Sequence, residues 1–251
     1  MSTPLLQVSG LGRRFGGLQA VADLDLVVHE SEILGVIGPN GAGKSTSFNM
    51  IAGSLLPSAG QILFQGQAMA GLPAHEFARR GILRTFQHNK PFASMSVCEN
   101  VMVGMHTRLD LSLWQVLAAA PQAWRVEQGA RERALELVEF VGLLEWLDAD
   151  VATLSFGQGR LLEIARALAG QPRLILFDEP AAGLTHAECE RLAQVITNIA
   201  AQGIAVLLIE HDMRFLMALA HRVVVLNFGR KIAEGTPAQV QADPAVMAAY
   251  L

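Results

Sequence analysis

The stretch Ile33–Ser45, ILGVIGPNGAGKS, decides the fold that this sequence predicts. Its last eight residues, Gly38 to Ser45, fit the pattern G-x-x-x-x-G-K-[ST] and follow an apolar run typical of a buried strand. Glycines let backbone N–H groups turn inward around phosphate oxygens, and the helix that follows adds its positive end. The stretch therefore predicts a strand, a phosphate-binding loop and a helix. The alternative is a glycine-rich strand-to-helix turn without a ligand.

Individual roles follow from this loop. Lys44 can reach the β- and γ-phosphates of a nucleotide, and the Ser45 hydroxyl can ligate Mg²⁺. The residues that we expect to contact the phosphates are Gly38, Asn40, Gly41, Gly43, Lys44, Ser45 and Thr46.

Outward from the loop, apolar runs recur from Leu174, Ala205 and Arg222, with helix-like periodicity between them. Unbroken apolar strands fit a parallel sheet covered on both faces. We therefore expect an α/β fold, a P-loop NTPase core formed by residues 1–95 and 171–251 of a single domain. The first third of the chain alternates like antiparallel strands, which predicts a β subdomain. About residues 96–170 read as an inserted helical subdomain.

Composition narrows the class of protein. The 19 basic and 23 acidic residues give a net charge of −4, so we expect no nucleic-acid partner. No apolar stretch is long enough to span a bilayer, and the start of the chain lacks an export signal. Cys98 and Cys189 have no motif spacing and read as reduced thiols. A cytoplasmic location is the expectation.

Two acids end the strand-like run LILFDEP. Asp178 can hold Mg²⁺, directly or through water, and Glu179 can accept a proton from an attacking water. The alternative is a pair of solvated acids that cap a strand. His211 ends another predicted strand and can donate to the γ-phosphate, although a structural role is its alternative.

Two further side chains are candidates on position alone. Gln87, in LRTFQ, can place its amide near Mg²⁺ and the water. Phe15 precedes the phosphate loop and can stack on a purine. Its alternative is an aromatic residue at a strand edge.

A second glycine-bearing turn, SFGQG from Ser155, opens a predicted helix. Ser155 and Gln158 form a capping box, and the buried stripe of the helix follows them. Gly157 and Gly159 keep the first turn bare, so its N–H groups can meet an anion. The phosphate loop of the same chain needs no second anion site, whereas an anion held by another molecule would explain one.

The order of these motifs resembles ABC-transporter ATPase subunits along nearly the whole chain. The closer resemblance is to the ATP-binding subunits of branched-chain amino acid importers, the LivG type. It is carried by RTFQHNKPFASMSVCENVMVG, DEPAAGL, IEHDM and the closing IAEGTPAQVQADPAVMAAYL. The resemblance implies ATP and Mg²⁺ as ligands, and two subunits that meet head to tail around each ATP.

The resemblance also implies roles for single residues. Phe15 would stack on adenine, Ser45 and Asp178 would serve the metal, and Gln87 would link the metal site to a permease. Glu179 would be the catalytic carboxylate and His211 would sense the γ-phosphate. The residues implied to act on the partner's ATP are Ser155, Gly157 and Gln158.

The implied partners are a second ATP-binding subunit, transmembrane permease subunits and, indirectly, a substrate-binding protein. The implied location is peripheral, on the cytoplasmic face of the inner membrane. Lys90, Phe92, Met95 and Met102 are candidate contacts for the permease, with a place in the core as the alternative for Phe92, Met95 and above all Met102. The cargo stays open between branched-chain amino acids and related small polar solutes, as does a copy or a paralogue as the second subunit. A lipopolysaccharide-export ATPase and a non-transport ABC ATPase are the alternative functions.

The sequence departs from the family at three positions. Phe156 stands where most members have glycine, and Thr185 replaces the usual loop acid that touches the partner site. Cys98 stands where an apolar or hydroxyl residue is expected, and we attach no function to it.

Overall fold

A six-stranded sheet lies at the centre of the part of the chain that this computed structural model describes, residues 4–85, 91–105 and 121–250. The order is β10-β9-β3-β8-β7-β6, and the strands span Arg230–Gly235, Arg222–Asn227, Ile33–Ile37, Ala205–Ile209, Leu174–Asp178 and Ile82–Arg84. Neighbours pair in parallel except β10 with β9. Every residue of β3, β7 and β8 is buried, as unbroken apolar runs predict.

A second sheet is antiparallel, as the alternating pattern of the first third predicts. Its order is β2-β1-β4-β5, and the strands span Leu18–Val28, Leu6–Phe15, Ala59–Phe64 and Gln67–Ala68. Helix α1 (Lys44–Ile51) packs between the two sheets, because Phe48 shares one hydrophobic cluster with side chains of β1 and β3.

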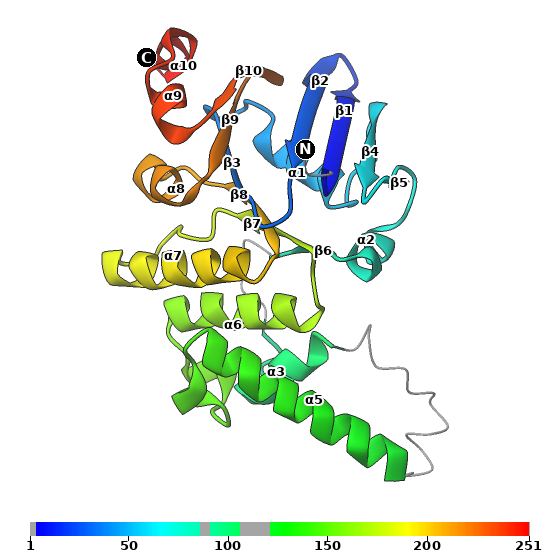
Figure 1. The fold of residues 1–251 in the computed structure, drawn as a ribbon, viewed down its shortest axis with the longest axis vertical. Coiled ribbons are helices and arrows are strands. Elements are labelled where there is room, and N and C mark those ends of the chain that lie inside the picture. The colour runs from blue at the N-terminus through cyan, green and yellow to red at the C-terminus, as the bar shows by residue number, and fades with distance from the viewer. Residues whose placement is uncertain (1–3, 86–90, 106–120, 251) are drawn as a thin grey trace.

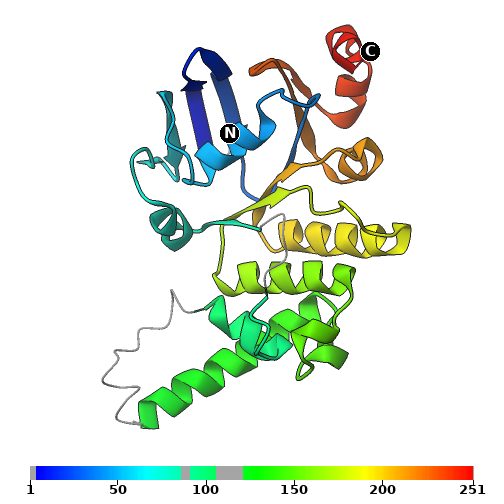
Figure 2. The same cartoon turned by 180° about the vertical axis from the view of Figure 1, so that it is seen from behind.

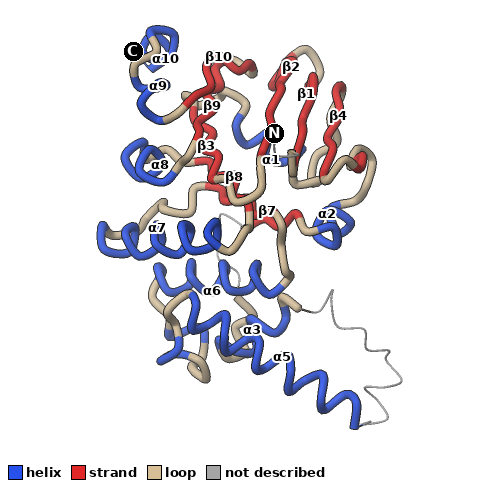
Figure 3. The backbone as a smooth tube through the Cα atoms, in the orientation of Figure 1, coloured by secondary structure: helices blue, strands red, loops and turns tan. Residues whose placement is uncertain are grey.

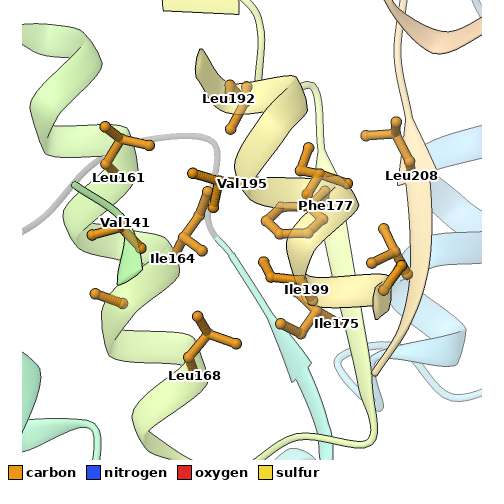
Figure 4. Close-up of a cluster of buried hydrophobic side chains, with 14 of the residues drawn as sticks. Val141, Leu161, Ile164, Leu168, Ile175, Phe177, Leu192, Val195, Ile199 and Leu208 are labelled. Atoms are coloured by element: carbon orange, nitrogen blue, oxygen red, sulfur yellow. The ribbon is translucent and has the colours of Figure 1, made fainter. Parts of the chain in front are cut away.

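Helices α7 (His186–Ala201) and α8 (Met213–Leu219) cover the other face of the central sheet (Figures 1 and 3). Figure 4 shows Phe177 and Leu208 of the sheet against Ile199 of α7, with α6 (Phe156–Ala169) packed on the far side of α7. One hydrophobic cluster lies on each face of the central sheet. Because successive residues of a strand point to opposite faces, each buried strand contributes side chains to both clusters.

The chain between β6 and β7 is helical wherever it is regular among the described residues. Its elements are α3 (Val97–Val103), α5 (Pro121–Phe140), the short 3-10 helices η1 (Leu144–Trp146) and η2 (Val151–Thr153), and α6. Figures 1 and 2 show this group beyond α7, away from the sheets. Its stripe of Ala134, Leu137, Val138 and Val141 is buried, as the periodicity predicts.

Three short helices complete the described fold: α2 (Ala74–Arg80), α9 (Pro237–Gln241) and α10 (Pro244–Tyr250). Among the described residues no helix has the length and apolar character needed to cross a membrane.

Candidate nucleotide site

The phosphate loop joins β3 to α1, and only glycine fits at two of its positions. A Cβ atom on Gly38 would lie 2.1 Å from the carbonyl oxygen of Leu226, and one on Gly43 would lie 2.6 Å from that of Ala20. Both glycines also have positive φ, 154° and 97°. The loop therefore packs directly on the backbone of β9 and of β2.

Hydrogen bonds fix the same loop from outside. The N–H of Gly229, in the turn between β9 and β10, donates to the carbonyl of Ala42 at 3.0 Å. The N–H of Ala22 donates to the carbonyl of Gly229 at 2.8 Å, so β2, the turn and the loop form one unit. The loop is thus held in shape by the fold itself.

Lys44 is buried at the start of α1 and its amine bonds to the loop. Its Nζ donates to the carbonyls of Gly38 at 2.6 Å and Pro39 at 3.1 Å. Burial lowers the pKa of Lys44, while the carboxylates of Glu179 and Asp178 act to raise it. Beside it, Ser45 is exposed and Thr46 half-buried, and Asn40 is an exposed residue of the loop.

Asp178, the last residue of β7, has a side chain that is only 1% exposed. Its Oδ2 accepts from Nη2 of Arg84 at 2.6 Å, whereas Oδ1 is buried and has no hydrogen-bond partner among the described residues. Buried carboxylate oxygens are normally satisfied. The unpartnered Oδ1 of Asp178, close to the phosphate loop, is the kind of oxygen ligand that a hydrated Mg²⁺ takes. The residues present therefore suit the predicted metal.

Glu179 and His211 meet at the ends of two adjacent strands. Nε2 of His211 lies 2.7 Å from Oε1 of Glu179. The backbone of Glu179 is left-handed, with φ of 49°, and its N–H donates to the carbonyl of Ile209 at 2.9 Å. A bulky residue in that region is held by its surroundings, and such strain clusters at functional sites.

Glu210 is a buried acid that sequence reasoning assigned no role. It accepts from the N–H of Ala181 at 2.7 Å and from that of His211 at 3.1 Å. Burial raises the pKa of Glu210, which these backbone hydrogen bonds act to lower. In the sequence, the only indication of this role is that a single acid follows the apolar run AVLLI. Through its two hydrogen bonds, Glu210 links the loop after Glu179 to His211.

The second glycine turn is the capping box that the sequence predicts. The Ser155 hydroxyl accepts from the N–H of Gln158 at 3.2 Å, and the Gln158 amide oxygen accepts from the N–H of Ser155 at 2.7 Å. A Cβ on Gly157 would lie 2.2 Å from Oε1 of Glu188. Hydrogen bonds from Thr185 lower the pKa of that Glu188 carboxyl.

Ser155, Gly157 and Gln158 line a small hollow of about 150 Å³, and no described residue of the phosphate loop lines it. Two of the three departures from the family pattern, Phe156 and Thr185, lie close by. Phe156 is exposed, with the Arg160 guanidinium 5.2 Å from its ring centroid, and Thr185 caps α7. The hollow and the phosphate loop are therefore separate features within one chain.

The remaining candidates are Phe15 and the residues expected to link the site to a permease. Phe15, 46% exposed, ends β1 at the hairpin to β2, with the Arg13 guanidinium 4.7 Å from its ring centroid. Gln87 and Lys90 lie outside the described residues. Phe92 is exposed and carries the Arg166 guanidinium 5.1 Å from its ring centroid, whereas Met102 packs against the core.

The fold and this arrangement of loop, strand-end acids and capped turn define a nucleotide-binding cassette. The chain belongs to the ABC transporter family, whose family model matches residues 21–182. A model described as branched-chain amino acid ATP-binding cassette transporter matches residues 230–251. The resemblance seen in the sequence is confirmed, as are the fold class and the enzyme class, because ATP hydrolysis is general for such cassettes.

Relatives match along the full chain. BraF, a high-affinity branched-chain amino acid transport ATP-binding protein of Pseudomonas aeruginosa, is 43% identical over 252 residues, 100% of this chain and 99% of its own. LivG of Escherichia coli, which carries the same description, matches equally. The lipopolysaccharide export ATP-binding protein LptB of Haemophilus influenzae is 35% identical over 98% of this chain and 97% of its own.

Solved structures agree with this fold. A nucleotide-free ATP-binding cassette from an ABC transporter superposes with a TM-score of 0.86 at 30% identity, covering 99% of both chains. The ADP conformation of an ABC-transporter cassette gives 0.85 at 29% identity, again over 99% of both chains.

Proposed function

We propose that this chain is the ATP-binding and hydrolysing subunit of an importer for branched-chain amino acids or related small polar solutes. The observation that carries the proposal is the identity of 43% with BraF and LivG over the whole chain. The match of residues 230–251 to the branched-chain amino acid cassette model supports the same cargo class.

In the proposed site the phosphate loop binds ATP through its backbone N–H groups and Lys44. Lys44 exchanges its bonds to the carbonyls of Gly38 and Pro39 for phosphate oxygens. Phe15 stacks on adenine, and Ser45, Gln87 and Asp178 hold the metal. When bound, Mg²⁺ neutralises charge on the phosphates.

Glu179 is the proposed general base, and the Glu179–His211 contact supports this role. Glu179 accepts a proton from a water whose oxygen bonds to the γ-phosphorus, and the bond to the β-phosphate oxygen breaks. His211 orients Glu179 and donates toward the γ-phosphate, so the pair acts together. Glu210 holds the backbone around both residues.

A second cassette, either a copy of this chain or a paralogue, completes each site. Ser155, Gly157 and Gln158 would bind the γ-phosphate held by the partner, which the separation of their hollow from the phosphate loop supports. Closure then depends on bound ATP and opening follows hydrolysis. Residues 96–170 act as the helical subdomain, and Gln87 and Phe92 link the nucleotide site to the permease at the cytoplasmic side of the membrane. A substrate-binding protein delivers the cargo to that permease.

The nucleotide part of the proposal is tested with the purified Glu179→Gln variant and ATP. We expect a dimer that forms only with ATP, as measured by analytical ultracentrifugation. A variant that binds ATP and stays monomeric would require a paralogue or permease for closure. A variant that binds no ATP would overturn the proposal.

The cargo is tested in cells that lack this chain. Uptake of labelled leucine, isoleucine and valine should fall, with labelled lysine as the control. Unchanged uptake of all three would exclude branched-chain amino acids as the cargo and leave the related small polar solutes. An outer-membrane lipopolysaccharide defect in its place would favour the export function suggested by the 35% identity with LptB.

A further inference from the structure

We infer that Arg84 is a positioning residue for the metal site. It binds one carboxylate oxygen of Asp178, which leaves the other oxygen for the metal, and it links this carboxylate to helix α1. The inference rests on the proposed nucleotide site and extends it to a residue outside the sequence motifs that define that site.

The guanidinium of Arg84 joins three elements of the fold. Arg84 ends β6, its Nη2 donates to Oδ2 of Asp178 at the end of β7, and its Nη1 donates to Oδ1 of Asn49 on α1. Both distances are 2.6 Å. Because α1 also carries Lys44 and Ser45, the carboxylate is held in register with the two side chains expected at the phosphates and the metal.

Burial makes this link strong. The side chain of Asp178 is 1% exposed and that of Arg84 is 21% exposed, and the guanidinium lies 5.9 Å from the ring centroid of Phe48 on α1. Charge-assisted hydrogen bonds strengthen where water is excluded. A planar fork serves two acceptors at once, which the single ammonium of a lysine does less well.

The same link determines what Asp178 can offer. With Oδ2 bonded to Arg84, the carboxylate presents one free oxygen, Oδ1, which is buried and unpartnered among the described residues. It is therefore set as a single-oxygen ligand rather than a two-oxygen clamp. Groups that orient metal ligands in this way typically contribute about 10–100-fold to metal affinity.

The test measures the binding of a fluorescent ATP analogue to the Glu179→Gln protein, once with Mg²⁺ and once with EDTA. Arg84→Gln should weaken binding with Mg²⁺ by roughly 10-fold or more, while binding in EDTA stays within about 2-fold. The ratio of the two affinities isolates the metal from folding. An equal loss in both conditions, or no loss in either, would overturn the inference.

Milder variants keep the test decisive if Arg84→Gln folds poorly. Arg84→Lys and Asn49→Ala should each lower the Mg²⁺-to-EDTA ratio, by less than Arg84→Gln does. Arg79→Gln is the matched control, because Arg79 pairs with Glu76 on the surface at 3.0 Å and should leave the ratio unchanged. If the parent protein binds the analogue in neither condition, the proposed function itself fails, which is distinct from a lost Mg²⁺ effect.

Discussion

The carboxylate of Glu179 and the imidazole of His211 are in contact, with Oε1 and Nε2 2.7 Å apart. They reach each other because β7 and β8 are parallel neighbours that end together, Asp178 opposite Ile209. The left-handed backbone of Glu179 turns its side chain off the strand at that point. The sheet therefore sets this contact, on which the proposed roles of Glu179 as the base and His211 as its orienting group depend.

Replacing Glu179, the proposed base, should slow ATP hydrolysis while leaving ATP binding intact. Glu179→Gln should lower the rate of ATP hydrolysis by roughly 10²–10⁴-fold, because the amide accepts no proton, while nucleotide binding persists. Phosphate release and equilibrium binding measure the two effects. Glu190→Gln is the control, since Glu190 forms a surface pair with His186 at 3.4 Å. Wild-type hydrolysis by Glu179→Gln would assign the base elsewhere.

Lys44 should be needed for affinity. Lys44→Ala should weaken ATP binding by roughly 10–100-fold, since a charged donor is typically worth about 1.5–3 kcal/mol. Isothermal titration calorimetry with ATP and Mg²⁺ measures the change. Lys231→Ala, at a lysine that pairs with Glu234 at 2.6 Å, should bind as the wild type does. Unaltered affinity of Lys44→Ala would contradict the phosphate assignment.

Gly38 should be intolerant of any side chain. Gly38→Ala places a methyl group 2.1 Å from a rigid backbone carbonyl, so the free energy of unfolding should fall by at least about 2 kcal/mol. Gly129→Ala, on the exposed side of α5 with no atom in the way, should raise it by about 0.5–1 kcal/mol. Urea denaturation compares the two variants. Equal stability of both would show that the loop yields.

Glu210 should make the free energy of unfolding depend on pH. Since burial raises its pKa in the folded state, the folded chain retains a proton that the unfolded chain releases. The free energy of unfolding should therefore fall as pH rises from the ordinary value of 4.5 toward the raised pKa. Glu210→Gln lacks this component. Its stability relative to wild type should rise over that range and then level off, and denaturation curves at several pH values measure it; a constant difference would contradict the assignment.

Cys98 should be inert. The side chain is fully buried in the helical group, and this burial raises the pKa of the thiol. In a Cys189→Ser variant, a thiol reagent at neutral pH should therefore label the folded protein only after denaturant is added. Rapid labelling without denaturant would place Cys98 at an accessible surface and reopen its role.

Much of this architecture follows from local sequence. The runs from Ile33 and Ala205, and the run from Leu174 up to Asp178, contain no polar side chain. Only a sheet covered on both faces buries such runs, so the parallel core was predictable. Strands β6 and β10 were not predicted, because short or half-exposed edge strands carry a weak pattern. Ser155 and Gln158 were predictable since a capping box closes within four residues.

The links between distant residues could not be predicted in this way. Arg84 and Asp178 are 94 residues apart, and nothing in LRTFQ distinguishes an arginine that bonds to a buried acid from one in solvent. Glu210 has the same difficulty, since its partner Ala181 offers only a backbone N–H. Such pairs depend on strand order, which a single sequence leaves open.

The clamping of the phosphate loop between Leu226, Gly229 and Ala20 has a kinetic meaning. Because these contacts already fix the conformation of the loop, it loses little conformational freedom when a nucleotide binds. Association should then be limited by diffusion into the site, with no slow rearrangement step. Different nucleotides would then be discriminated by their dissociation rates, which depend on the contacts that each one makes once it is bound.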